Sequence, residues 1–184
     1  VGLLLLAVGC SDDESDPTYP PQPQPPVGTW FLAVWGTGPD DIYAVGQPGL
    51  IYHWNGTAWS RQESGVSVAL TDVWGQDGTV YVTGHDGVVL RKAGGGWQRM
   101  DTGTEADLFG IGDYRGTIHA GGRDGTLRRL GSGCWATAPD EIYTRDNEDA
   151  VLDTLLRSED VESVTAISRY GIAGSDGMIL MDDP

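Results

Sequence analysis

The segment Thr83-Gly84-His85-Asp86-Gly87-Val88-Val89 has three counterparts elsewhere in the chain. These are Val45-Gly46-Gln47-Pro48-Gly49-Leu50-Ile51, Gly121-Gly122-Arg123-Asp124-Gly125-Thr126-Leu127 and Ala173-Gly174-Ser175-Asp176-Gly177-Met178-Ile179. Gly46, Gly84 and Gly122 are 38 residues apart, and Gly174 follows 52 residues later, so the fourth unit contains an insertion of about 14 residues. A fixed period of this length indicates tandem structural repeats.

Aromatic residues follow the same period. Trp35 and Trp74 are 39 residues apart and Phe109 follows 35 residues later, while Trp59, Trp97 and Trp135 are spaced by 38. We interpret these six side chains as packing residues between repeats rather than as a cage around a ligand, because one repeat cannot bury its apolar face alone.

Each repeat predicts four short antiparallel strands. In the second unit, alternation of apolar residues and turn residues predict strands over Leu70–Gly75, Thr79–Thr83, Val88–Arg91 and Trp97–Met100. Four such strands in about 40 residues are typical of a β-propeller blade. The turn positions of the repeat are Gly46, Gly49, Gly84, Asp86, Gly87, Gly122, Asp124, Gly125, Gly174, Asp176 and Gly177.

The sequence therefore predicts an all-β domain over residues 27–184, a β-propeller of about four blades. Its expected core face consists of Ile42, Ala44, Leu50 and Tyr52 in the first unit and of Val80, Val82, Val88 and Leu90 in the second. Because the last unit ends after its third strand, we expect the segment Val27–Phe31 to pair with that unit and close the ring. The alternative is an open arc or a fragment of a larger propeller. An unpaired outer strand would otherwise expose a sheet edge.

The stretches Val34–Gly46 and Ile51–Trp59 resemble the tandem repeats of bacterial secreted and lipoprotein β-propellers. These are loosely similar to Asp-box propellers of the sialidase type and to photosystem-assembly-factor propellers. The resemblance implies an architecture and not a chemistry. An Asp-box has the form Ser-x-Asp-x-Gly-x-Thr-Trp, whereas this chain has Asn55-Gly56-Thr57-Ala58-Trp59. No sialidase catalytic residue is assigned.

The fourth unit contains an insertion over about residues 139–163. Residues 146–158 predict a short helix with Val151, Leu152, Leu155 and Leu156 on one face. Two registers remain open just before it. Trp135 is either a fourth-strand residue of the third unit, which we favour, or part of a degenerate extra blade that begins at Cys134.

The N-terminus predicts export and lipidation. Residues 1–9 are apolar and too short to span a bilayer, and they match the end of a secretory signal segment from which the beginning is missing. Ala7-Val8-Gly9-Cys10 resembles a lipoprotein cleavage site, which implies that Cys10 carries the lipid. The alternative is a buried N-terminal strand with a free thiol.

Residues 10–26 predict a tether between that anchor and the domain. An acidic run, Ser11–Asp16, is followed by ten residues that include six prolines. Such a segment favours an extended spacer of about 3 Å per residue. The expected location is the cell envelope, attached by lipid to a membrane, at the periplasmic face of the outer membrane or at the cell surface.

The formal net charge of −16 argues against nucleic acid as a partner. Residues 30–138 contain eleven acidic and eight basic residues, so most of the excess lies in the tether and the insertion. Phosphate binding requires a basic stripe, which this sequence lacks.

No motif of a known active site is present, and no cofactor is predicted. Asp86, Asp124 and Asp176 precede glycines in equivalent turns, which suggests calcium binding. However, Asp-Gly is common in tight turns for conformational reasons. The histidines lack zinc-ligand spacing. The expected function is a protein- or glycan-binding scaffold module, and the alternative is a glycan-processing enzyme of sialidase or lyase type. Binding is favoured because no arginines and carboxylates are evident at matched repeat positions around a central channel.

Overall fold

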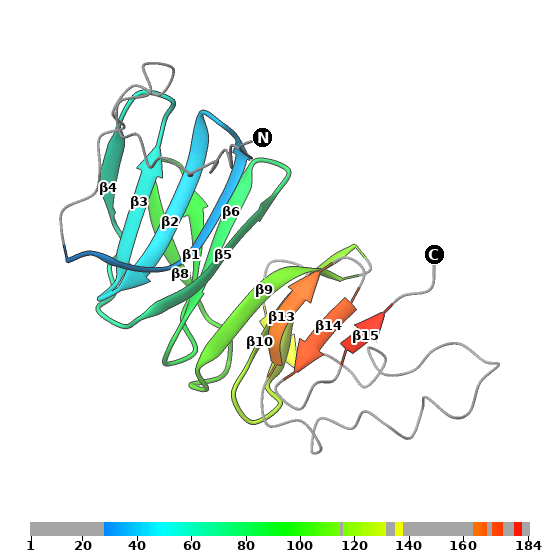
Figure 1. Ribbon diagram of the computed structural model, residues 1–184. Helices are drawn as coiled ribbons and strands as arrows, with labels where there is room; N and C mark the ends of the chain where they lie inside the picture. Colours follow the sequence, from blue (N-terminus) through cyan, green and yellow to red (C-terminus); the bar gives the residue numbers. More distant parts are fainter. Residues whose placement is uncertain are drawn as a thin grey trace, which may run out of the picture.

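The computed structural model describes residues 28–114, 116–131, 135–137, 164–168, 171–174 and 179–181. Within these ranges every regular element is a β-strand, and the strands form four antiparallel sheets (Figure 1). The expectation of an all-β protein is therefore confirmed. No helix in the described ranges has the length and apolar character needed to cross a membrane.

Each sheet is formed by consecutive strands. The first sheet contains β1 (Trp30–Gly38), β2 (Asp41–Gln47), β3 (Leu50–Trp54) and β4 (Trp59–Glu63). The second contains β5 (Leu70–Gln76), β6 (Thr79–Gly84), β7 (Val89–Ala93) and β8 (Gly96–Met100). The third contains β9 (Leu108–Tyr114), β10 (Thr117–Gly122), β11 (Leu127–Leu130) and β12 (Trp135–Thr137). The fourth contains β13 (Val164–Ser168), β14 (Gly171–Gly174) and β15 (Ile179–Met181). Each sheet thus corresponds to one sequence repeat, and Trp135 belongs to the fourth strand of the third.

The sheets stack in chain order through their first strands. β1 contacts β5, β5 contacts β9, and β9 contacts β13, which gives the succession seen in Figure 1. A core between the first two sheets contains Tyr43, Val45, Ile51, Leu70, Val73, Val80, Val82, Val88 and Leu90. A smaller core between the second and third contains Tyr81, Val89, Leu108, Ile111 and Ala120.

The central strands are buried on both faces, which differs from the single core face expected. In the second sheet Val82 and Leu90 face the first sheet, while the adjacent Tyr81 and Val89 pack toward the third. In the first sheet Tyr43, Val45 and Ile51 form the core with the second sheet, and the predicted Ala44 and Tyr52 are also buried. Ile42 and Leu50 are only half-buried. The second sheet has a neighbouring sheet on each side, so both sets of its alternating residues become apolar. In the first sheet, Tyr52 is instead in edge contact with the Phe31 ring of β1.

The expected pairing of the N-terminal strand with the last unit is wrong. Trp30 and Phe31 pair with Gln47 and Gly46 of β2, as the first residues of β1. One continuous strand extends from Trp30 to Gly38, so Trp30 and Phe31 belong to the first sheet. In the described residues β15 is hydrogen-bonded only to β14, and the stack therefore has two ends.

Candidate functional site

One end of the strands, along the side of the stack, is formed by the turns between second and third strands and by the linkers that join successive sheets. In the first sheet Gly49 N donates a hydrogen bond to Val68 O at 2.8 Å. In the second, Gly87 N donates to Ala106 O at 3.0 Å. Each turn is thereby fixed to the linker that follows its own sheet, which gives this end a regular, repeated backbone.

A hydroxyl group strengthens the same junction in both repeats. Ser64 Oγ is within hydrogen-bonding distance of Gly49 O (2.7 Å) and Val66 O (3.1 Å). Thr102 Oγ1 makes the equivalent contacts with Gly87 O (2.8 Å) and Thr104 O (3.2 Å). Both residues are buried. Because an unsatisfied buried carbonyl costs about 1–3 kcal/mol, these hydroxyls stabilise the junction.

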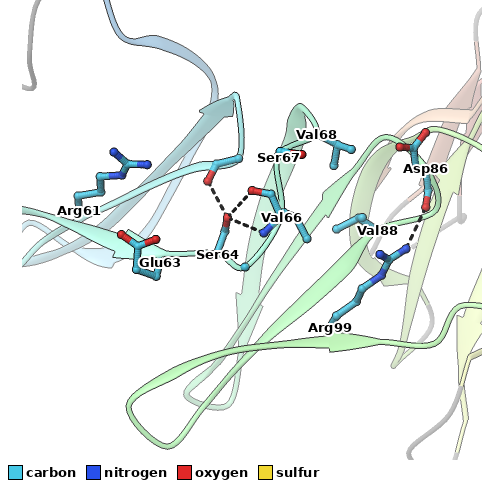
Figure 2. A pocket seen from close by; sticks show the side chains of 11 residues that line it. Arg61, Glu63, Ser64, Val66, Ser67, Val68, Asp86, Val88 and Arg99 are labelled. Carbon is cyan, nitrogen blue, oxygen red and sulfur yellow. Dashed lines mark hydrogen bonds between the residues drawn. The ribbon is translucent and has the colours of Figure 1, made fainter.

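A pocket of about 510 Å³ lies at this end, between the first and second sheets (Figure 2). Arg61 and Glu63 reach it from β4, and Arg99 reaches it from β8. The remaining lining residues are Gly49, Ser64, Gly65, Val66, Ser67, Val68, Asp86 and Val88. The pocket therefore combines three valine side chains with hydrogen-bond donors and acceptors of both charges.

Arg61 and Arg99 occupy equivalent positions in their sheets. Arg61 pairs with Tyr52, and Arg99 pairs with Leu90. Each residue of the second pair follows its counterpart in the first by 38 residues. Both arginine side chains are exposed. Arg99 Nη2 donates to Asp86 O at 3.3 Å, whereas no carboxylate of the described residues pairs with the Arg61 guanidinium. The Arg61 donors are thus available to a ligand.

Another arginine near this end, Arg123, is already paired. Arg123 Nε and Nη2 donate to Asp107 Oδ2 at 3.2 and 3.0 Å, and Asp86 N donates to Asp107 Oδ1 at 3.2 Å. Partial burial opposes ionisation of Asp107, but these hydrogen bonds outweigh it and lower the pKa of the carboxyl. Asp107 therefore ties the turns of the second and third sheets together.

A second polar cluster lies on the face of the first sheet that is turned toward the second. His53 Nε2 is 2.7 Å from Asp41 Oδ1, and Thr37 Oγ1 donates to Asp41 Oδ2 at 2.7 Å. Desolvation opposes ionisation of Asp41, yet the hydrogen bonds from Thr37 and His53 lower its pKa. The His53 ring stacks on Tyr43 with 4.4 Å between ring centroids.

Lys92 joins this cluster to the second sheet. Lys92 Nζ and Trp97 Nε1 both donate to Gln62 Oε1 at 2.8 Å. The ammonium also lies 5.3 Å from the centroid of the Tyr43 ring and 5.1 Å from that of Trp97. Partial burial lowers the pKa of Lys92, and the Asp41 carboxylate offsets part of this effect. These contacts hold β2 and β4 against β7 and β8, so we interpret the cluster as structural.

The turn residues divide into two kinds. Gly49, Gly87 and Gly125 have φ values of 55°, 63° and 61°, and Asp86 and Asp124 also adopt the left-handed region with φ of 55° and 56°. Gly84 and Gly122 end second strands and Gly46 is the next-to-last residue of its second strand. A Cβ atom at each would meet a backbone carbonyl at the start of the first strand of the same sheet or just before it. Gly174 ends β14, whereas Asp176 and Gly177 lie outside the described residues.

Neither the aspartates nor the histidines form a metal site in the described part of the chain. No three His, Cys, Asp or Glu side chains gather there closely enough to hold an ion. His53 pairs with Asp41, His85 packs against Phe109, and the buried His119 has Nδ1 at 2.9 Å from Thr117 O. Asp86 and Asp124 have a conformational role in their turns, since aspartate tolerates a positive φ.

The six aromatic residues of the repeat lie in different contacts. Trp35 and Trp97 pack on the core between the first two sheets, and Trp74 packs on the core between the second and third. Trp59 contacts Trp54 within the first sheet, and Phe109 contacts His85. Trp135 begins β12.

The sequence alone did not reveal that two arginines from equivalent repeat positions lie together at the pocket. The period of 38 contains the signal, because Arg61 and Arg99 fall on equivalent positions. However, matched arginines were considered only as a feature of a central channel, where none are evident, whereas Arg61 and Arg99 lie on β4 and β8, the last strands of their sheets.

Cys10, the tether over residues 10–26 and the helix expected over 146–158 lie outside the described residues. No protein-family model matches the chain, and no curated protein is similar to it in sequence.

Proposed function

We propose that this chain is a glycan-binding module of the cell envelope, in which the sheets are consecutive blades of a β-propeller. The observation that carries the proposal is the pocket between the first two sheets, where two exposed arginines from equivalent repeat positions face a shared space. Its volume of about 510 Å³ is within the usual range of small-molecule sites.

The lining suits a sugar that bears a carboxylate. The guanidinium of Arg61 can hold a carboxylate through two parallel hydrogen bonds, which is the strongest pairing available to an exposed arginine. Glu63 and Asp86 supply acceptors for hydroxyl groups, and Ser67 supplies a hydroxyl of its own. The valine side chains at 66, 68 and 88 offer apolar contact to the C–H face of a sugar ring.

The test is binding of the full chain to an array of acidic and neutral glycans. Loss of a charged hydrogen bond costs about 1.5–3 kcal/mol, so the double variant Arg61→Ala/Arg99→Ala should bind acidic glycans at least about tenfold more weakly. Arg91→Ala is the control, because Arg91 is exposed on β7, does not line this pocket and is not part of the core between the first two sheets. An array on which the wild type binds no glycan, or on which the double variant binds as the wild type does, contradicts the proposal.

We also propose that the module is attached to a membrane through lipid on Cys10, with residues 11–26 as a spacer. The basis is the apolar run that ends at Cys10 and the acidic and proline-rich segment behind it. In a bacterial host fed a palmitate analogue, the chain expressed with its natural start should become labelled and fractionate with membranes. Cys10→Ser should abolish both, while Cys134→Ser should change neither. Unchanged labelling of Cys10→Ser would show that the anchor assignment is wrong.

A further inference from the structure

The pocket between the first two sheets has a smaller counterpart one repeat further along. This second pocket has a volume of about 340 Å³. Its lining residues are Gly87, Arg99, Met100, Asp101, Thr102 and Thr104. The hollow at this end of the stack is thus a repeated feature and not an isolated irregularity of one loop.

The two pockets are built from equivalent residues. Arg61 corresponds to Arg99, Glu63 to Asp101 and Ser64 to Thr102, each at an offset of 38 residues. The backbone positions follow the same offset, since Gly49 corresponds to Gly87 and residue 66 to residue 104. At these equivalent positions each pocket has one arginine, one carboxylate and one turn carbonyl that accepts a hydrogen bond from a buried hydroxyl, and the first pocket has Arg99 and Asp86 in addition.

Arg99 connects the two pockets, because it lines both. A ligand that leaves the first pocket past Arg99 reaches the second without crossing the core. Stacked sheets lie about 10 Å apart, so equivalent groups of adjacent sheets recur on that scale. A chain of several sugar units is long enough to follow such a series, whereas a single sugar is not.

Resting on the proposed function, we infer that the two pockets form one tandem site for a linear glycan in which carboxylate-bearing sugars alternate with neutral ones. Arg61 and Arg99 receive successive carboxylates. Glu63 and Asp101 lie beside them as acceptors for hydroxyl groups. The acidic residues also repel a chain with a charge on every unit, which favours a sparsely charged ligand.

The series of arginines has two members in the described sheets. Arg99 pairs with Leu90, and the equivalent pair in the third sheet is Arg128 with Thr137. The position that follows Arg61 and Arg99 in the repeat is thus threonine, which has no cationic group. The site accordingly spans the first two sheets. Ligand affinity should rise with the length of the glycan only until both arginines are bound.

The test is titration calorimetry of the full chain with hyaluronan oligosaccharides, in which glucuronate alternates with N-acetylglucosamine, from the disaccharide to the octasaccharide. Two linked sites raise affinity about 100-fold or more over one site. We expect that rise between the disaccharide and the longer chains, followed by a plateau. Chitin oligosaccharides of the same lengths, which lack carboxylates, should show no such rise. Arg91→Ala serves as the matched control and should titrate as the wild type does.

Arg61→Ala separates the tandem site from simple binding. In this variant the second pocket remains, so the disaccharide should still bind within about twofold of the wild type, while the gain with length should be lost, as expected when only one of two linked sites remains. If affinity is independent of length, or if Arg61→Ala retains the gain with length, the tandem site is wrong although glycan binding stands. If no oligosaccharide binds at any length and no other acidic glycan binds on the array, the proposed function itself fails.

Discussion

Gly87→Ala is expected to lower the free energy of unfolding by about 3 kcal/mol or more, through both a strained backbone and a steric clash. Gly87 has a φ of 63°, where a residue with a Cβ atom is strained. The added methyl group would also lie against the backbone carbonyl of Thr104 in the linker. Neither group can move freely, because Gly87 N donates a hydrogen bond to Ala106 O and Thr102 Oγ1 is within hydrogen-bonding distance of both Gly87 O and Thr104 O. Denaturant unfolding followed by tryptophan fluorescence measures the loss.

Gly78→Ala is the matched control for this change. Gly78 also has a positive φ, 75°, but a Cβ atom there has no neighbour within 4 Å. It should therefore lose only the conformational component, about 1–2 kcal/mol. Gly49→Ala should behave like Gly87→Ala, since its φ is 55° and its Cβ atom would meet Val66 O. Equal losses for Gly78 and Gly87 would show that the turns are not packed on the linkers.

Local features of the fold could be predicted from the sequence because they depend on residues close together in the chain. Alternating residues and Asp-Gly turns place the four strands of Leu70–Met100 near their observed positions. The positive φ of Asp86 and Gly87 likewise follows from the turn chemistry of that dipeptide. Such signals are contained within one repeat, and the period then extends them to the other repeats.

Features that depend on how repeats stack could not be predicted in the same way. The contact of Lys92 with Gln62 and the pair of His53 with Asp41 require the register of two sheets or of two strands. The pocket likewise forms only when the β4–β5 linker is placed beside Asp86 and Arg99. The alternation of residues along one strand identifies the two faces of a sheet, but it does not show whether a neighbouring sheet covers each face.

Val73→Asp should destabilise the protein by several kcal/mol, whereas Val34→Asp should cost less than about 1 kcal/mol. The two valines occupy equivalent positions, since Val34 pairs with Ala44 and Val73 pairs with Val82. Val73 is 3% exposed in the core between the first two sheets, so an aspartate there buries an unpaired charge. Val34 is 68% exposed, on the face of the first sheet against which no other sheet of the described residues packs. Chemical denaturation of the two variants gives the comparison.

The difference between these variants reports whether the first sheet ends the stack in solution. Trp30 and Leu32, at 67% and 50% exposed, extend the bare apolar region around Val34 along β1. In a closed ring a further sheet would cover this region, as the first sheet covers Val73. Val34→Asp would then cost as much as Val73→Asp. Sedimentation velocity distinguishes the two ways of covering Val34. A monomer that is sensitive to Val34→Asp indicates closure within one chain, and a dimer that dissociates in this variant indicates association of two copies through β1.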